Sequence, residues 1–171
     1  MLKAVEQLLK GERTSVGNHR VEHSEDTYGN KHTIDRYYYH STAICIADIT
    51  TQTFIIDNGG WNTQSTNRAI SDYRKFFNDR CYTEVFKYFY QLIEAIVDMP
   101  MDSMRKYFYG DFSNPPIAIT AKKRMLGTEK FIEINVAKQS ETYTHSYEIK
   151  YKGPKTLEKQ AKDCMHELFP L

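Results

Sequence analysis

The chain has 171 residues, a mass of 20.1 kDa and a formal net charge of +1. Its 40% hydrophobic and 26% charged residues are typical of a globular protein that is large enough to bury a core. The near-zero charge excludes an acidic mimic of nucleic acid and a strongly basic protein that coats phosphate backbones. We therefore expect a single domain over residues 1–171.

Apolar runs and cysteines indicate the cellular setting. No run approaches the length of a membrane-spanning helix, and the first six residues lack the pattern of a signal peptide, so we expect no membrane contact. Cys45, Cys81 and Cys164 are scattered and form no Cys-x-x-Cys pair. We expect free thiols in a reducing cytoplasm.

Hydrophobic periodicity predicts the elements. Helices are expected over residues 1–10, 66–79, 82–98 and 155–168, with a short helical piece at 102–109. Strands are expected over 18–24, 32–39, 41–47, 53–57, 117–121, 130–137 and 142–151. The first two should form a hairpin, and the strand over 32–39 should run straight on into 41–47. The order of these helices and strands along the chain predicts an α+β fold, with an antiparallel sheet of about five to seven strands and three to four packed helices.

A glycine-rich turn separates the strand at 53–57 from the helix at 66–79. Gly59 and Gly60 are suited to positive φ, and Ser65 or Thr66 is expected to cap the helix. Trp61, the only tryptophan, stands where strand gives way to helix. We predict that its indole is buried as a structural anchor between sheet and helix.

The same turn resembles a family of small uncharacterised bacteriophage proteins, in which a strand pair is followed by Gly-Gly-Trp-x-Thr-x-Thr-Thr and a helix. The matching positions cover about a quarter of the chain and are Gly59, Gly60, Trp61, Thr63, Ser65 and Thr66. Ser65 replaces a threonine and keeps the hydroxyl group. The resemblance implies a phage origin and brings no catalytic mechanism with it.

Histidines and carboxylates are the candidates for metal chemistry. His19 and His23 are four residues apart, but on a strand this spacing separates them by about 13 Å, so we predict surface histidines and no metal site. Glu133, Glu148 and Lys150, with Asp111, fit loosely the two carboxylates and lysine of a metal-dependent nuclease. A solvated pair of charges across two strands explains the same residues.

Basic and aromatic residues alternate in two places, at 36–40 and 105–109, and a third run is purely basic. Such residues suit stacking on unpaired bases, a contact surface for a partner protein, or ordinary packing. We expect the hairpin of residues 18–39 and a turn at 122–124 to form the contact surface. The candidate partner-binding residues are Arg36, Tyr38, His40, Lys122, Lys123 and Arg124.

These observations favour a phage accessory protein that binds a host protein or nucleoprotein complex in the bacterial cytoplasm, without catalysis and without a cofactor. Inhibition of a host defence, such as a CRISPR nuclease, is the expected use, by analogy with small phage proteins. Two alternatives stay open. One is a nucleic-acid-binding protein of phage replication or recombination, and the other is the nuclease that uses Glu133, Glu148 and Lys150.

Overall fold

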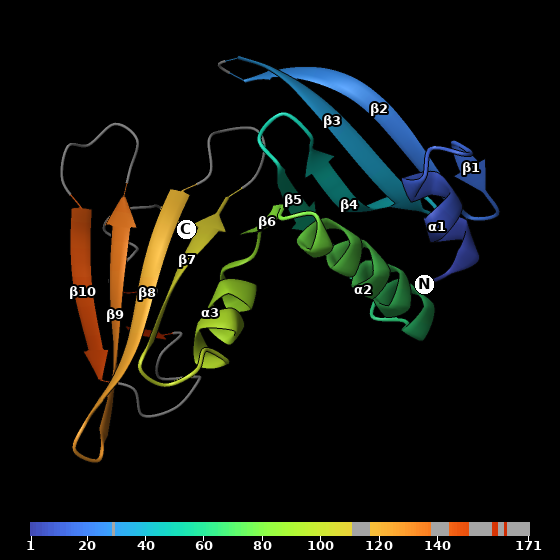
Figure 1. Ribbon diagram of the computed structural model, residues 1–171. Coiled ribbons are helices and arrows are strands. Elements are labelled where there is room, and N and C mark those ends of the chain that lie inside the picture. Colours follow the sequence, from blue (N-terminus) through green and yellow to red (C-terminus); the bar gives the residue numbers. More distant parts are fainter. Residues whose placement is uncertain (29, 111–116, 138–143, 151–158, 161–162, 164–171) are drawn as a thin grey trace. The chain divides into compact units, whose positions relative to one another are not determined.

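The computed structural model of the chain describes residues 1–28, 30–110, 117–137, 144–150, 159–160 and 163 (Figure 1). These residues form ten strands and three helices, and they divide into two compact units. Unit 1 holds Met1–Lys87, and unit 2 holds Tyr88–Gly110 and the described residues from 117 onward. The fold class is α+β, as predicted, but the described residues hold more strands than expected, and the prediction of an entirely antiparallel sheet is wrong because one pair of strands is parallel. The prediction of one domain stays a prediction.

Unit 1 is a twisted sheet whose strands lie in sequence order. They are β1 (Ser15–Val16), β2 (His19–Tyr28), β3 (Asn30–Tyr39), β4 (Thr42–Asp48), β5 (Thr53–Ile56) and β6 (Thr83–Phe86). All neighbours are antiparallel except β5 and β6, which are parallel. Helices α1 (Lys3–Leu9) and α2 (Gln64–Asp79) complete the unit, and α2 lies along one face of the sheet (Figure 1).

The core of unit 1 forms where α2 meets this sheet. Tyr37 of β3 contacts Tyr73 of α2, with ring centroids 4.9 Å apart, and Phe54 of β5 stacks on Phe77 at 5.4 Å. These side chains are buried, as the spacing of Ile70, Tyr73 and Phe77 predicted for the apolar face of this helix. The strand over 53–57 and the hairpin of β2 and β3 are also confirmed.

Unit 2 is a four-stranded antiparallel sheet with one helix. Helix α3 (Phe89–Val97) is followed by β7 (Ser103–Tyr109), β8 (Ile117–Leu126), β9 (Glu129–Ala137) and β10 (Thr144–Lys150). Alternate residues of β8 and β9 are buried, among them Ile119, Ala121, Ile132 and Ile134. The hydroxyl of Tyr107 in β7 donates to the carbonyl of Ala95 in α3, so this buried face is the one that α3 covers.

Three element predictions are wrong. The strand over 32–39 does not continue, because His40 and Ser41 form a two-residue turn that pairs Tyr39 with Thr42. The expected helix over 82–98 begins as β6, since Cys81 adopts a positive φ of 61° and residues 83–84 pair with β5. The helical piece at 102–109 is β7, which pairs with β8 along its whole length. In each case pairing with a distant strand overrides a local pattern.

Most of the expected helix over 155–168 lies outside the described residues, although 159, 160 and 163 are helical. Cys164 and Asp111 also lie outside them. Cys45 is a buried free thiol and Cys81 an exposed one. None of the helices in the described residues has the length and apolar character needed to cross a membrane.

Candidate functional site

The loop between β5 and α2 is held by its own side chains. Asp57 Oδ1 accepts a hydrogen bond from the Gly59 N–H at 2.8 Å, and Asn58 Oδ1 accepts one from the Gly60 N–H at 2.9 Å. The Trp61 N–H then donates to the Asn58 carbonyl at 3.0 Å. Such turns fix the backbone of each residue, so the loop has a defined shape without help from a partner.

Gly59 brings this loop against the start of β4. Its φ is +60°, and a Cβ atom built on it would lie 2.4 Å from Thr42 Cγ2. No larger residue fits there without displacing Thr42. Gly60 also has a positive φ, of 85°, but a Cβ atom there would meet open space. The first glycine of the motif is therefore required by contact as well as by conformation.

A chain of hydroxyl groups marks the start of α2. Thr63 is the N-cap, and its Oγ1 accepts a hydrogen bond from the Thr66 N–H at 3.2 Å. The expected cap at Ser65 or Thr66 is therefore wrong. The Tyr39 hydroxyl donates to Ser65 Oγ at 3.2 Å, Ser65 Oγ lies 3.2 Å from Thr63 Oγ1, and the Thr63 and Thr66 hydroxyls are 2.8 Å apart. This network joins β3 to the helix start.

A β-bulge supplies the floor of a pocket beside this network. Tyr37 pairs with Cys45, but Tyr38 pairs with Ala43, which leaves Ile44 as the extra residue of β4. Ile44 and Cys45 are therefore both buried although they are adjacent in sequence. Burial raises the pKa of the Cys45 thiol well above its ordinary value.

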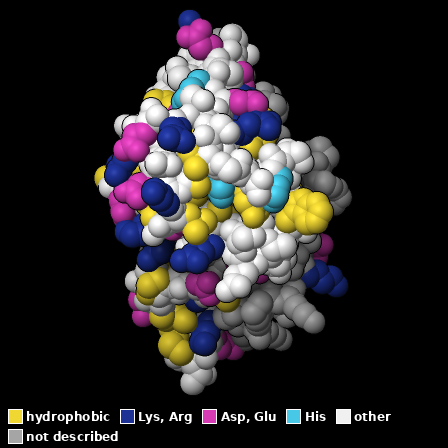
Figure 2. All heavy atoms as spheres, turned by 90° about the vertical axis from the view of Figure 1, so that its right-hand side faces the viewer, with side chains coloured by type: hydrophobic (Ala, Val, Ile, Leu, Met, Phe, Trp, Pro, Cys, Tyr) yellow, Lys and Arg dark blue, Asp and Glu magenta, His cyan; other side chains and the backbone are white. Residues whose placement is uncertain are grey.

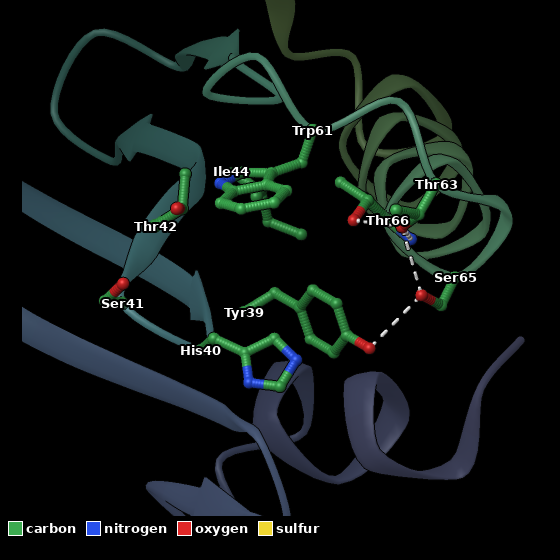
Figure 3. Close-up of a pocket in the computed structure, with 9 residues that line it drawn as sticks. All are labelled: Tyr39, His40, Ser41, Thr42, Ile44, Trp61, Thr63, Ser65 and Thr66. Atoms are coloured by element: carbon green, nitrogen blue, oxygen red, sulfur yellow. Dashed lines mark hydrogen bonds between the residues drawn. The ribbon is translucent and has the colours of Figure 1, made fainter.

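The pocket has a volume of about 350 Å³ and is contained in unit 1. The indole of Trp61 and the phenol of Tyr39 stand on opposite sides of it, with Ile44 between them and hydroxyl groups on the remaining sides (Figure 3). Among the residues that the structure describes, none of the pocket's lining side chains is aspartate, glutamate, lysine or arginine. The lining residues are Tyr39, His40, Ser41, Thr42, Ile44, Trp61, Thr63, Ser65 and Thr66.

Trp61 is exposed. Its relative accessibility is 61%, so the prediction of a buried anchor is wrong. Among the described residues the indole makes no ring contact and its Nε1 has no hydrogen-bond partner. The space-filling view shows a hydrophobic side chain standing out beside a histidine on this side of the protein (Figure 2). A large aromatic residue on a fixed loop, left uncovered, is the feature of the site that folding does not explain.

Two histidines contact Tyr39, whose ring forms the wall of the pocket opposite Trp61. The Tyr39 ring contacts His40 at 4.4 Å and His19 at 4.7 Å, measured between centroids. His19 is buried, so the prediction that it is a surface histidine is wrong, and its Nδ1 has no hydrogen-bond partner. Burial, and to a lesser degree the nearby His40, lowers the pKa of His19. His40 itself is exposed and has a φ of 54°, in the left-handed region, where histidine is among the non-glycine residues found most often.

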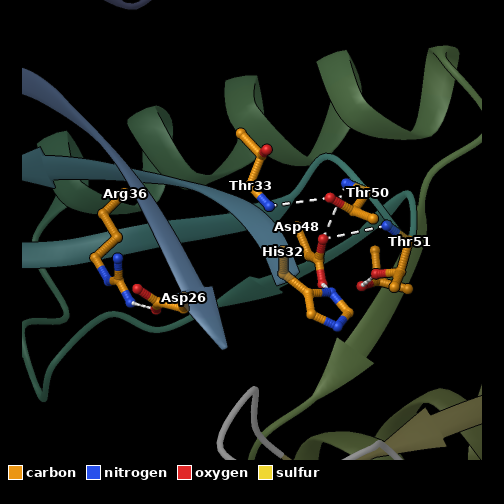
Figure 4. Close-up of polar contacts among 8 residues, drawn as sticks. Asp26, His32, Thr33, Arg36, Asp48, Thr50 and Thr51 are labelled. Carbon is orange, nitrogen blue, oxygen red and sulfur yellow. Dashed lines mark hydrogen bonds and ion pairs between the residues drawn. The ribbon is translucent and has the colours of Figure 1, made fainter. Parts of the chain in front are cut away.

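Arg36 and Tyr38 lie on the other face of β3. The Arg36 guanidinium donates to Ser24 Oγ at 2.5 Å and forms an ion pair with Asp26 (Figure 4). Tyr38 is half-buried beneath the Arg20 guanidinium, 4.1 Å from the ring centroid. Of the three candidate partner-binding residues Arg36, Tyr38 and His40, only His40 lines the pocket.

The basic run at 122–124 is part of strand β8 and not a turn, so that prediction is wrong. Lys123 is only 6% exposed, and its Nζ donates to the carbonyls of Val97 at 2.5 Å and Met99 at 3.2 Å, at the end of α3. Burial lowers the pKa of this amine. Lys123 is therefore a helix-capping residue of unit 2 and offers no contact surface. Lys122 is exposed, and Arg124 forms an ion pair with Glu148.

The proposed nuclease residues are brought together only in part. Glu133 of β9 lies directly opposite Glu148 of β10, a pair of like charges, and on its other side it lies opposite Lys122 of β8. Glu148 binds Arg124, and Glu133 Oε1 accepts from the Asn135 amide at 3.0 Å. In the described part of the chain no three His, Cys, Asp or Glu side chains gather as a metal site would need. The carboxylates are thus engaged by their neighbours, and the geometry favours a surface charge network.

Two other histidines are paired with carboxylates. His32 Nδ1 lies 2.7 Å from Asp48 Oδ2, both residues are buried, and Asp48 Oδ1 also accepts from the N–H groups of Thr50 and Thr51 (Figure 4). His23 Nδ1 lies 2.7 Å from Asp35 Oδ1 at the surface. The His32–Asp48 contact holds the turn between β4 and β5.

Sequence reasoning found the glycine–tryptophan turn but missed Tyr39, Ser41, Thr42 and Ile44. The available signal was the polar pair His40-Ser41 between two strand-like runs, which reads as a two-residue hairpin turn. No protein-family model matches the chain, and no curated protein matches it.

Proposed function

We propose that the protein acts by binding a host protein through the surface around Trp61, without catalysis. The observation that supports this most directly is the exposed indole on a hydrogen-bonded loop. Tryptophan is the residue most enriched among those that dominate binding energy at protein interfaces. Because the loop is already ordered, little conformational entropy would be lost when a partner covers it.

The composition of the surrounding surface supports a protein partner. Tyrosine, serine, glycine, asparagine and tryptophan are the residues that antibody loops use to recognise proteins, and they make up most of this turn and pocket. Aromatic rings supply contact area with few rotatable bonds, and hydroxyl groups supply adaptable hydrogen bonds. The resemblance of residues 59–66 to a phage family supports a phage accessory protein, which would meet its partner in the bacterial cytoplasm. We propose inhibition of a host-defence complex, such as a CRISPR nuclease, as the outcome of binding.

The test is capture of partners from a bacterial lysate by the tagged protein, with and without nuclease treatment, followed by the affinity of the purified partner. Trp61→Ala should weaken binding tenfold or more and change the free energy of unfolding by less than about 1 kcal/mol. Ile49→Ala is the matched control, because Ile49 is an exposed apolar residue at the opposite end of β4. Equal binding by the Trp61 and Ile49 variants would contradict the proposal.

A second candidate function, binding of single-stranded nucleic acid, is favoured by one observation in unit 2. On the sheet face opposite α3, Lys106 Nζ lies 5.2 Å from the Phe108 ring centroid and Arg124 Cζ lies 5.7 Å from that of Phe131. Aromatic rings that alternate with cations can stack bases and hold phosphates. If Lys106, Lys122 and Arg124 contact phosphates, the logarithm of the affinity should fall with the logarithm of salt with a slope of about −2. Phe131→Ala should then abolish binding, and an affinity independent of salt would exclude this candidate.

A further inference from the structure

We propose that the pocket between Trp61 and Tyr39 receives one uncharged, flat side chain, aromatic or proline, from the partner protein. This inference rests on the proposed function and adds to it the chemistry of the group that is recognised. It follows from the charge, shape and hydrogen-bonding groups of the pocket.

The described lining favours an uncharged group. A carboxylate or phosphate entering the pocket would find no lysine or arginine among the nine lining residues. An ammonium or guanidinium group could make cation–π contacts with Trp61 or Tyr39, but none of the nine lining residues is a carboxylate that would pair with it. Moving an ionised group out of water without a charged partner costs a large desolvation free energy, whereas the cost for an uncharged group is small.

The arrangement of the walls selects a flat group. The indole of Trp61 and the phenol of Tyr39 face the cavity from opposite sides (Figure 3). A flat group inserted between them would cover the exposed indole and contact the methyl groups of Ile44. The wall formed by Tyr39 is stiff because His19 and His40 contact its ring and Ser65 accepts its hydroxyl proton.

The size of the pocket limits the occupant to about one residue. A volume of about 350 Å³ is at the lower end of the range for sites that bind small molecules. It would hold a single side chain and cannot admit a helix. The hydroxyl groups of Ser41 and Thr42 lie beside this space, where they can bond to the main chain of the inserted segment.

A nucleobase is also flat and uncharged, but it arrives attached to phosphate. Nucleic-acid sites depend on lysine and arginine for most of their affinity, and neither is among the nine described residues that line this pocket. The observations therefore favour a protein segment, and the nucleobase becomes an outcome of the test.

The experiment uses the full chain and the fluorescence of Trp61, its only tryptophan. Three probes are titrated separately: N-acetyl-phenylalaninamide, N-acetyl-argininamide and adenosine. We expect N-acetyl-phenylalaninamide to shift the indole emission with a dissociation constant on the order of 1 mM, as for a ligand of this size. Argininamide and adenosine should bind at least tenfold more weakly. Tighter binding of adenosine or argininamide, or no shift with any probe, would overturn the proposal.

Two variants test whether the shift in Trp61 emission comes from binding in the pocket. Ser65→Leu places an apolar side chain in the cavity and should weaken the phenylalaninamide shift at least tenfold. Gln64→Leu is the matched control, because it makes the same kind of change at the neighbouring exposed position, which does not line the pocket. An equal effect of the two variants would overturn the proposal, and their circular dichroism shows whether both are folded.

The partner protein separates this inference from the function on which it rests. If Trp61→Ala loses the partner while Ser65→Leu keeps it, the interface stands and insertion into the pocket is refuted. If neither variant loses the partner, the proposed function fails, whatever the small probes show.

Discussion

Gly59 gives the sharpest test of how the loop is held. Gly59→Ala should destabilise the protein through two separate costs. A positive φ costs an alanine about 1–2 kcal/mol relative to glycine. The new Cβ atom would also lie 2.4 Å from Thr42 Cγ2, and overpacking of this kind costs about 1–3 kcal/mol. We therefore expect a loss of about 2–5 kcal/mol in the free energy of unfolding.

Two further variants separate these costs. Gly60→Ala has the positive φ but no atom within 4 Å of its Cβ, so it should lose only about 1–2 kcal/mol. Thr42→Ser removes Cγ2 and leaves Oγ1 and Cβ at 3.5 and 3.6 Å from the Gly59 Cβ position, which are ordinary contacts. In the Thr42→Ser background, Gly59→Ala should therefore cost no more than Gly60→Ala.

Urea unfolding followed by circular dichroism measures all of these differences. The double-mutant cycle should give a coupling of about 1–3 kcal/mol between positions 42 and 59. A coupling near zero, or equal losses for the two single glycine variants, would refute the close approach of the loop to β4. Because Gly60→Ala leaves that approach intact, only Gly59→Ala should also change the emission of Trp61.

Three further predictions concern buried polar groups. Tyr73→Phe should raise the free energy of unfolding by about 1–2 kcal/mol, because the Tyr73 hydroxyl is buried with no hydrogen-bond partner. If urea unfolding shows a lower free energy of unfolding for this variant, the hydroxyl has a hydrogen-bond partner after all. Asp48→Ala should lower the free energy of unfolding by about 3–5 kcal/mol, because it removes the carboxylate that binds His32 and the N–H groups of Thr50 and Thr51. A decrease of less than about 1 kcal/mol would rule out a structural role for Asp48. Burial lowers the pKa of His19, so the unfolded chain binds the proton more readily, and stability should fall as the pH drops below about 6.5. His19→Gln should weaken this dependence in thermal unfolding at several pH values, and an unchanged slope would contradict it.

The parts of the fold that could be predicted are those whose partners are close in sequence. The apolar face of α2 follows from the spacing of Ile70, Tyr73 and Phe77, and the hairpin of β2 and β3 follows from its turn. Strand β6 could not be predicted in this way, because its pairing with β5 crosses the whole of α2. Its residues, Thr83–Phe86, carry an apolar pattern that also continues a helix, and only the positive φ of Cys81 separates the two.

The candidate site was predicted only at its turn, for a similar reason. Hydrophobicity suggested that Trp61 is buried, but the turns made by Asp57 and Asn58 set the backbone so that the indole faces solvent. The opposite wall comes from β3, more than 20 residues earlier, and it reaches α2 through the contact of Tyr39 with Ser65. For Lys123 the error was the reverse: it was predicted to lie at the surface, because lysine is seldom buried, but it is buried and donates hydrogen bonds to the carbonyl groups at the end of α3.

The distribution of unfavourable features is itself evidence for where function lies. Lys123 is an unusual buried residue, but its contacts with two carbonyl groups explain it by folding alone. Around Tyr39, by contrast, the left-handed backbone of His40, the unpaired Nδ1 of His19 and the exposed indole of Trp61 lie together. Unit 1 also has a left-handed backbone at Gln52 and Cys81 and a buried, unpartnered hydroxyl at Tyr73, so neither feature alone marks a site. What distinguishes the pocket is that such features lie beside the exposed indole of Trp61.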